Sequence, residues 1–320
     1  MNKIYFIVNP QAKNGYCQKI WKKLESILLK ENIPYMAFFT EYRGHAKEIA
    51  ENLAGKPGEK QLLLVAVGGD GTMHEVVNGV SSFRNVRVSY IPCGSGNDFS
   101  RGFGVPRNPT QALYSIIHEV NDDAILVDTG KITNNEEKEL YFVNNMGAGL
   151  DALISRDVNR STIKRFLNKL SLGKFVYVYF LLKNLFRYTC KSIKITVDEQ
   201  TYSFDSAWFV TVSNQPFYGG GMKISPEASP YDGELNITVV HNLSRLKLLF
   251  VFITVFWGGH VSFKEVEMFI GKSISIHSDT PLYAHADGED VGLTPLTINI
   301  CQQALPLLVK GMTIKKEEVG

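Results

Sequence analysis

An apolar run leads straight into a glycine loop at Leu62-Leu63-Leu64-Val65-Ala66-Val67-Gly68-Gly69-Asp70-Gly71-Thr72. Six consecutive apolar residues of this kind predict a strand buried on both faces, as in a parallel sheet. Glycines at the carboxyl end of such a strand let backbone N–H groups approach phosphate oxygens, and the N-terminus of the helix predicted at Met73–Val80 adds partial positive charge. The stretch therefore predicts a phosphate-binding loop. The simpler alternative is a tight strand–helix turn capped by Thr72.

Short strand-like runs alternate with helical patterns on both sides of this stretch, up to about residue 130. Asn108 before Pro109 is a typical helix start, because asparagine caps free N–H groups and proline fits the first helical position. This alternation predicts a parallel sheet covered by helices on both faces. The predicted strands are Ile4–Val8, Tyr35–Phe39, Leu62–Val67, Val88–Ile91 and Ala124–Thr129, and the predicted helices are Gln18–Lys30, Ala46–Leu53, Met73–Val80 and Pro109–Glu119.

Strand-like runs dominate the chain after about residue 130, and turn clusters such as Ala286-Asp287-Gly288 separate them, which is typical of antiparallel strands. We expect an α/β domain over residues 1–130 and a mostly antiparallel β-sandwich over 131–306, with helical inserts near 160–188 and 244–258. The C-terminal segment 307–320 is expected to return to the first domain. The predicted strands here are Tyr141–Asn144, Ser192–Val197, Ser206–Ser213, Leu235–Val240, Ser273–His277, Leu296–Ile300 and Leu307–Ile314.

A second loop of small and polar residues follows the next predicted strand, at Gly94-Ser95-Gly96-Asn97-Asp98-Phe99. Ligands of open parallel sheets bind at the carboxyl ends of the strands, so this loop and Gly68–Thr72 are expected to converge on one ligand. A carboxylate there repels phosphate, so Asp70 is interpreted as a metal-linked or structural group. Asn9-Pro10 begins a third candidate loop, which has neither a Walker A motif nor G-x-G-x-x-G.

Composition limits the classes of partner. The 34 basic and 32 acidic side chains nearly cancel, so charge gives no argument for nucleic acid and none is expected as a partner. The four cysteines lack metal or disulfide spacing, which favours a reduced, cytoplasmic protein. The seven histidines show no metal-ligand spacing either, and His285 is expected at the surface.

Two apolar stretches bear on membrane contact. Neither Phe175–Tyr188 nor Leu248–Trp257 reaches the roughly 20 apolar residues that span a bilayer. The first is amphipathic, which usually means core packing, but nearby basic residues also favour peripheral contact with the anionic inner face of a membrane. The second is expected to be buried, or to line a slot for an acyl chain. The basic residues are Lys164, Arg165, Lys169, Lys174, Lys183 and Arg187.

Taken in order, these motifs resemble those of the soluble bacterial diacylglycerol and lipid kinases, which are relatives of the catalytic domains of eukaryotic diacylglycerol, ceramide and sphingosine kinases. Gly68–Thr72 with Glu75 and Asn78-Gly79 is similar to the family's GGDGT-x-x-E-x-x-N-G, of which NAD kinases share the GGDGT. The series is more specific than any one motif. Also similar are Asn9-Pro10, Thr40 with Gly44-His45-Ala46, Gly94–Phe99, Asn145–Ala152, Gly219–Met222 through Ser225-Pro226 to Asp232-Gly233, and Asp287-Gly288-Glu289.

The resemblance implies an α/β nucleotide-binding domain of the NAD kinase/diacylglycerol kinase type and a β-sandwich, with the active site between them. It implies transfer of the γ-phosphate of ATP to a lipid hydroxyl, by default that of diacylglycerol, with Mg²⁺. Asp287 is then the candidate base, and Glu289 orients it or binds metal. Taken alone, Asp287 fits an Asp-Gly turn that caps its own backbone. The implied nucleotide-binding residues are Asn9, Pro10, Thr40, Gly68, Gly69, Asp70, Gly71, Thr72, Glu75, Gly94, Ser95 and Asn97, and the implied metal site, partly through water, comprises Asp232, Glu234, Asp70 and Asp98.

Two other functions fit parts of the pattern. An NAD kinase would share the GGDGT loop but phosphorylate a dinucleotide, whereas the later motifs and the apolar helices favour a lipid. A catalytically inactive nucleotide- and lipid-binding regulator would not need to keep all the acidic residues of these motifs. The acceptor stays open among diacylglycerol, phosphatidylglycerol, a sphingoid base and an undecaprenol-like alcohol. A homodimer also stays open, because sandwich edges are exposed.

Overall fold

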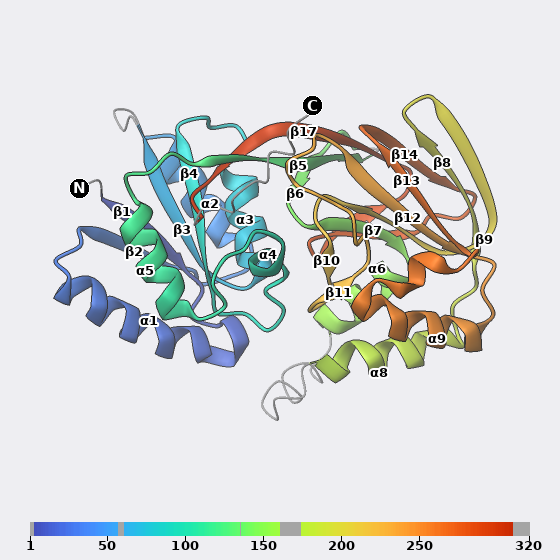
Figure 1. Ribbon diagram of the computed structural model, residues 1–320, viewed down its shortest axis with the longest axis horizontal. Coiled ribbons are helices and arrows are strands. Elements are labelled where there is room, and N and C mark those ends of the chain that lie inside the picture. The colour runs from blue at the N-terminus through green and yellow to red at the C-terminus, as the bar shows by residue number, and fades with distance from the viewer. Residues whose placement is uncertain (1–2, 57–60, 135, 161–173, 310–320) are drawn as a thin grey trace, which may run out of the picture.

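The computed structural model describes residues 3–56, 61–134, 136–160 and 174–309, with the backbone alone at 160 and 174–178. Figure 1 shows an N-terminal part, from β1 to α5, beside a strand-rich part, from β5 to β17. The N-terminal elements are β1 (Ile4–Val8), α1 (Ala12–Lys30), β2 (Tyr35–Phe39), α2 (His45–Ala54), β3 (Leu62–Gly68), α3 (Asp70–Val80), β4 (Val86–Pro92), α4 (Asp98–Gly102) and α5 (Pro109–Glu119).

The N-terminal part is the parallel α/β sheet that the alternating pattern predicts, with one exception. The fifth predicted strand, Ala124–Thr129, is the start of β5 (Ile125–Asn134), which pairs antiparallel with β17 and β6. The other four strands lie in the order β4-β3-β1-β2, and every neighbouring pair is parallel. All residues of β1, β3 and β4 are buried. The two polar residues of β4 are hydrogen-bonded, because Arg87 donates to the carbonyls of Val120 and Asp122 and the Ser89 hydroxyl donates to that of Leu308. The predicted cap at Asn108 is confirmed, because its side chain accepts hydrogen bonds from the amides of Thr110 (2.9 Å) and Gln111 (3.2 Å).

The strand-rich part is mostly antiparallel, as expected. Its strands follow the order β16-β15-β7-β9-β8-β14-β17, with β12 and β13 attached through β9 and with β5 and β6 attached through β17. The elements are β5 (Ile125–Asn134), β6 (Glu139–Phe142), β7 (Asn145–Gly149), α6 (Leu150–Arg160), α8 (Lys174–Leu185), β8 (Lys191–Val197), β9 (Gln200–Ser213), β10 (Phe217–Tyr218), β11 (Met222–Lys223), β12 (Leu235–His241), α9 (Arg245–Thr254), η1 (Val255–Trp257), η2 (Gly259–Ser262), β13 (Val266–Gly271), β14 (Ser273–Ser278), β15 (Tyr283–Ala286), β16 (Glu289–Leu293) and β17 (Leu296–Leu307).

Strand β17 ties the two parts together (Figure 1). It pairs with β14 and β5 in the strand-rich part, and its last residue, Leu307, lies beside Val88 of β4 in parallel. The amide of Leu308 then donates to the carbonyl of Val88 at 2.8 Å. The remainder of the predicted returning segment, residues 310–320, lies outside the described residues.

Several strands differ from the sequence expectation. The strand predicted at Tyr141–Asn144 is β6, which ends at Phe142, and the glycine-rich segment Asn145–Gly149 forms the buried strand β7. Strands β10, β11, β13, β15 and β16 were not predicted, and β17 runs from the strand predicted at Leu296–Ile300 to the first residue of the one predicted at Leu307–Ile314. The composition of β7 gives no strand signal, because this segment is rich in glycine. Its strand conformation depends on pairing with β9 and β15. Among the described residues, no helix has both the length and the apolar character needed to cross a membrane.

Candidate active site

The two predicted phosphate loops touch each other at their backbones. A Cβ atom on Gly94 would overlap the Cα atom of Gly69, so this approach requires glycine. The carbonyl of Gly68 accepts hydrogen bonds from the Cys93 amide (2.6 Å) and the Tyr90 hydroxyl (3.0 Å). Neighbouring parallel strands thus place both loops at one edge of the sheet, beside the N-terminus of α3.

A cleft of about 750 Å³ opens in front of these loops and is lined by both parts of the molecule. Sites that bind small molecules commonly measure about 300–1,000 Å³, so the volume suits a nucleotide. Five of the predicted residues do not line it: Pro10, Gly68, Asn97, Asp232 and Glu234. Those that line it are Asn9, Thr40, Gly69, Asp70, Gly71, Thr72, Glu75, Gly94, Ser95, Asp98, Asp287 and Glu289.

Some residues predicted to contact the nucleotide form hydrogen bonds within and between the loops. Glu75 accepts hydrogen bonds from the amides of Gly44 (2.8 Å) and Ala46 (3.0 Å), so its carboxylate holds the start of α2 against α3. The Asn97 side chain accepts from the Gly94 amide at 3.1 Å and shapes its own loop. The Asn9 amide donates to the Thr72 hydroxyl at 3.1 Å, which joins the first loop to the GGDGT loop.

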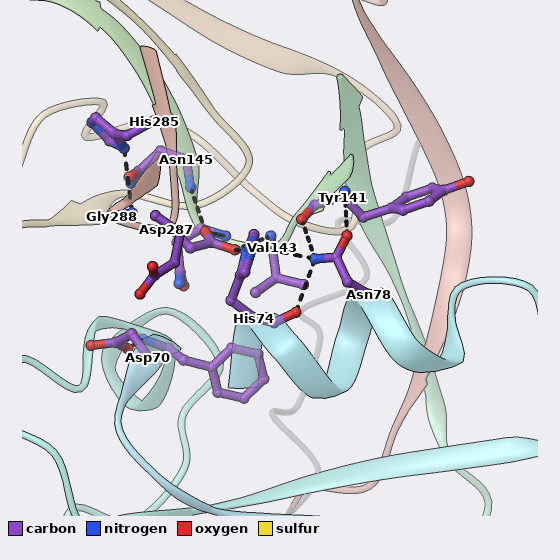
Figure 2. Close-up of polar contacts among 12 residues, drawn as sticks. Asp70, His74, Asn78, Tyr141, Val143, Asn145, His285, Asp287 and Gly288 are labelled. Atoms are coloured by element: carbon purple, nitrogen blue, oxygen red, sulfur yellow. Dashed lines mark hydrogen bonds and ion pairs between the residues drawn. The ribbon is translucent and has the colours of Figure 1, made fainter. Parts of the chain in front are cut away.

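Asp287 lies at the centre of the site, between the two parts (Figure 2). Its Oδ1 accepts from the amides of Asn144 (2.9 Å) and Asn145 (3.3 Å), and its Oδ2 accepts from the Val143 amide (3.1 Å) and lies 3.0 Å from Nδ1 of His74. A carboxylate has about four acceptor positions, so all of them are occupied. Its side chain is 1% exposed. Asp287 is therefore rigidly held.

His74 is a residue of the site that the sequence analysis did not single out. Asn78, one helical turn later, donates to the Tyr141 carbonyl (2.9 Å) and accepts from the Tyr141 amide (2.9 Å), which fixes its amide orientation. Its NH₂ group faces Nε2 of His74 at 3.4 Å (Figure 2). A proton on Nε2 would oppose that NH₂, so we assign the proton to Nδ1, which donates to Asp287. The only sequence signal was its spacing, two residues after Thr72 and four before Asn78.

Asp70 and Asp98 form an acidic pair on the floor of the cleft. Burial first, and then the negative charge of Asp98, raise the pKa of Asp70 to about 7, with a smaller contribution from Asp287. The Phe99 amide, which donates to Asp70 at 3.0 Å, opposes that shift. Burial also raises the pKa of Asp98, against the hydrogen bonds from the Gly220 amide (2.7 Å) and Arg101 (2.7 Å). The Gly220 bond links a loop of each part.

Glu289 closes one side of the cleft. Its Oε2 forms an ion pair with the exposed guanidinium of Arg43, which comes from the loop before α2. Its Oε1 would lie 2.9 Å from a Cβ atom on Gly71, so a side chain there would require the carboxylate to move. The last acidic residue of Asp287-Gly288-Glu289 thus contacts the N-terminal part, and its role in orienting the base or binding metal stays a prediction.

Asp232 lies in the turn before β12, where it accepts from the Glu234 amide at 3.0 Å. Burial, and then the charges of Glu234 and Asp128, raise its pKa. Asp128 fastens this turn by accepting from the Gly233 amide at 2.7 Å. Within the described ranges, no group of three His, Cys, Asp or Glu side chains has an arrangement that could hold a metal ion. The metal roles of Asp232 and Glu234 stay predictions.

His285 is buried, so its expected surface position is wrong. Its Nε2 lies 3.1 Å from the Tyr218 hydroxyl and 3.4 Å from Oδ2 of Asp151. Tyr218 lines both the cleft and an apolar cavity of about 70 Å³ under α9. That volume is far below the range for a whole ligand, so the cavity as it stands is no slot for an acyl chain.

Each half of the chain matches a known protein family. Residues 3–131 match the model of the diacylglycerol kinase catalytic domain, and residues 144–309 match the YegS C-terminal NAD kinase beta sandwich-like domain. A candidate lipid kinase of Bacillus subtilis, YtlR, is 31% identical over 97% of this chain and 100% of its own length. A diacylglycerol kinase of Mycobacterium tuberculosis is 28% identical over 83% of this chain and 82% of its own.

The crystal structure of a candidate diacylglycerol kinase of Bacillus anthracis has the same fold. It covers 96% of this chain and 97% of its own, with a TM-score of 0.73 and 25% identity. The fold similarity thus extends across both parts. Because the two family models cover both halves and a relative aligns along almost the whole length, the chain belongs to the lipid kinases built on the diacylglycerol kinase catalytic domain, and it is a phosphotransferase.

Proposed function

We propose that the protein transfers the γ-phosphate of ATP to the hydroxyl of diacylglycerol, giving phosphatidic acid, in a Mg²⁺-dependent reaction at the cytoplasmic face of a membrane. The observation that carries this proposal is the single cleft in which Gly69, Gly94 and the N-terminus of α3 face Asp287 and Glu289. Exposed backbone amides and a helix N-terminus stabilise phosphate oxygens, and carboxylates supply metal ligands and a base. The name of the Mycobacterium relative favours diacylglycerol as the acceptor.

The acidic pair suits Mg²⁺. Asp70 and Asp98 repel each other in a buried setting, which contributes to the raised pKa of Asp70, and a cation beside them would relieve that repulsion. Mg²⁺ prefers carboxylate and phosphate oxygens and keeps several waters, so two carboxylates and the nucleotide are a sufficient donor set. When bound, it would neutralise charge on the phosphates during transfer.

We assign the base to Asp287, the role that the resemblance implies for it. Its carboxylate is held by three backbone amides and by His74, so taking the proton of the acceptor hydroxyl would replace one of these hydrogen bonds. Asp70 is assigned to the cation. Its pKa of about 7 belongs to the site without a cation, and Mg²⁺ beside it would lower that pKa, so Asp70 would stay ionised during transfer.

Two variants test this assignment. Asp287→Asn should lower kcat by roughly 10²–10⁴-fold at every Mg²⁺ concentration, because it removes the base. Asp70→Asn should raise the Mg²⁺ concentration needed for half-maximal activity, because it removes one carboxylate of the acidic pair. Steady-state kinetics over a Mg²⁺ series measure both effects. A kcat of Asp287→Asn close to that of the wild type would contradict the assignment.

The acceptor is identified by incubating the protein with labelled ATP, Mg²⁺ and a panel of lipid alcohols plus NAD. Label is expected in diacylglycerol and absent from NAD. The NAD kinase-like description of the sandwich makes NAD the necessary comparison. Label in NAD but in no lipid would overturn the proposal.

A further inference from the structure

Helix α9 is apolar on both of its faces. Leu248 and Val251 face inward and are buried. On the opposite side Leu246, Phe250 and Ile253 recur at spacings of four and three residues, which is one stripe of a helix, and Trp257 follows in η1. They are 54–70% exposed. A helix that is apolar all round is normally buried in a protein or in lipid, so the outer stripe needs an occupant. The sequence-based expectation that this helix is buried holds for its inner face only.

Helix α8 continues this surface. Tyr179, Leu182 and Phe186 recur at spacings of three and four residues and are 44–64% exposed. The end of α8 touches the start of α9, because Nε of Arg245 donates to the carbonyl of Leu185 at 3.1 Å. Figure 1 shows both helices along the lower side of the strand-rich part. We call the combined surface the α8–α9 face; it comprises Tyr179, Leu182, Phe186, Leu246, Phe250, Ile253 and Trp257.

The size of this face is unusual for a monomer. An aromatic side chain offers about 150–250 Å², so the four aromatic residues at their observed exposures present on the order of 500 Å². The three aliphatic residues enlarge that area. The largest apolar patch of a typical monomer measures about 300–600 Å² and is often functional.

Charge on the two helices favours an anionic surface. Residues 174–187 and 243–263 contain no aspartate or glutamate. Their basic residues include Lys183, Arg187, Arg245 and Lys247, of which Lys183 pairs with Asp157 at 3.9 Å and Lys247 pairs with Glu265 at 2.6 Å. The net charge of these segments is therefore positive, while their exposed apolar side chains are the larger feature. This combination is typical of helices that lie in a membrane interface.

The α8–α9 face lies on the other side of α9 from an apolar cavity that adjoins the active site. The inner side of α9 lines the apolar cavity, and Tyr218 belongs to the wall of both that cavity and the catalytic cleft. The path from the outer stripe to the cleft therefore crosses one helix and one cavity. A kinase acting on a membrane lipid must bring the lipid hydroxyl to its cleft while the acyl chains stay in an apolar environment. A bilayer against α9 meets that requirement.

We propose that the α8–α9 face docks on the surface of a phospholipid bilayer containing anionic lipids, with its aromatic and aliphatic side chains inserted at the headgroup boundary. The choice of a bilayer as the occupant rests on the proposed lipid kinase function. The docking itself requires no catalysis, so the two are tested separately.

Vesicle binding tests the docking. The full chain is sedimented with vesicles of phosphatidylcholine and phosphatidylglycerol, and with vesicles of phosphatidylcholine alone. Wild type should bind the anionic vesicles more strongly, and Phe250→Glu/Trp257→Glu should reduce binding at least tenfold. Leu29→Glu is the matched control, because Leu29 is an equally exposed leucine on α1, and it should bind like the wild type. Equal binding by the double variant would overturn the proposal.

Fluorescence gives a second readout. Trp21 and Trp208 are buried and Trp257 is exposed, so a blue shift on adding vesicles reports on Trp257. Trp257→Phe should bind vesicles without that shift. If instead the wild type is dimeric and the double variant monomeric, with no vesicle binding by either, the occupant is a second copy and the proposal fails.

Activity separates this proposal from the proposed function. On diacylglycerol embedded in anionic vesicles, the double variant should be at least tenfold slower than the wild type. On a short-chain, water-soluble diacylglycerol the two should agree within about twofold. Loss of both activities in the double variant alone would contradict a pure docking role. If the wild type phosphorylates neither acceptor but still binds vesicles, the proposed acceptor fails and the docking surface stands.

Discussion

Single carboxylates of this site have distinct roles because their surroundings differ. Asp287 is saturated by hydrogen bonds, three of them from backbone amides, and is rigidly held. Asp70 receives a bond from the Phe99 amide and lies close to the charges of Asp98 and Asp287. The same residue type is thus a fully hydrogen-bonded carboxylate in one place and, without a cation, a group that titrates near neutral pH in the other.

Asp70 should make stability depend on pH. Its pKa is about 7 in the folded protein, against 3.8 as the ordinary value, so the folded state holds the proton more tightly than the unfolded state. This contribution to stability is complete below pH 4 and is lost as pH rises to about 7. Asp70→Asn lacks this titrating group. Between pH 4 and pH 7, its free energy of unfolding should therefore increase relative to that of the wild type by up to roughly 4 kcal/mol. Urea unfolding in EDTA measures it.

Asp198 supplies a control of opposite sign. The amides of Ser273 and Lys272 lower the pKa of Asp198, so its contribution to stability is present above pH 4 and is lost below it. Asp198→Asn should therefore be less stable than the wild type only above about pH 4. A stability difference for Asp70→Asn that is the same at pH 4 and pH 8 would contradict the role given to Asp70.

At the scale of elements, the site depends on two strand ends that can meet only if neither loop carries a side chain at the contact. Gly69 and Gly94 supply that freedom, and the Gly68 carbonyl bonds the loops together. Glu75 on α3 then fixes the start of α2. Each phosphate loop is thus positioned by its neighbours as much as by its own sequence.

Gly94→Ala should separate the loops. Its Cβ atom would overlap the backbone of Gly69, which cannot yield as a flexible side chain does. We expect a loss of about 1–3 kcal/mol in stability and at least a hundredfold fall in kcat/KM for ATP. Gly55→Ala is the control, because its added Cβ would lie 3.3 Å from the Glu51 carbonyl, far from the cleft. Unchanged ATP kinetics in Gly94→Ala would show that the loops do not bind the nucleotide together.

At the scale of the whole molecule, the cleft is closed by a few contacts between the N-terminal part and the strand-rich part. His74 contacts Asp287, Asp98 accepts from the Gly220 amide, and Arg43 pairs with Glu289. Strand β17 adds a backbone connection through Leu307. Each of these contacts joins two residues that lie more than 100 positions apart in the chain.

His74→Ala tests whether the parts act as one unit. Removing a donor to a buried carboxylate should cost about 1–3 kcal/mol and raise KM for both substrates, because both parts line the cleft in which the proposed reaction takes place. Thermal unfolding and steady-state kinetics measure these effects, with His118→Ala on α5 as the control. Combining His74→Ala with Asp287→Asn should cost less than the sum of the single changes. Strict additivity would mean that the contact does not couple the parts.

The sequence by itself determined the local elements of the N-terminal part and the motifs that mark the site. Buried strands need continuous apolar residues and close loop contacts need glycine, so Leu62–Thr72 carries its structure in its composition. The tertiary structure alone decided which strands close the second part, where β7 forms from a segment without strand character. It also decided that His74 holds Asp287 and that the outer side of α9 stays uncovered, because both depend on which distant segments the fold brings together.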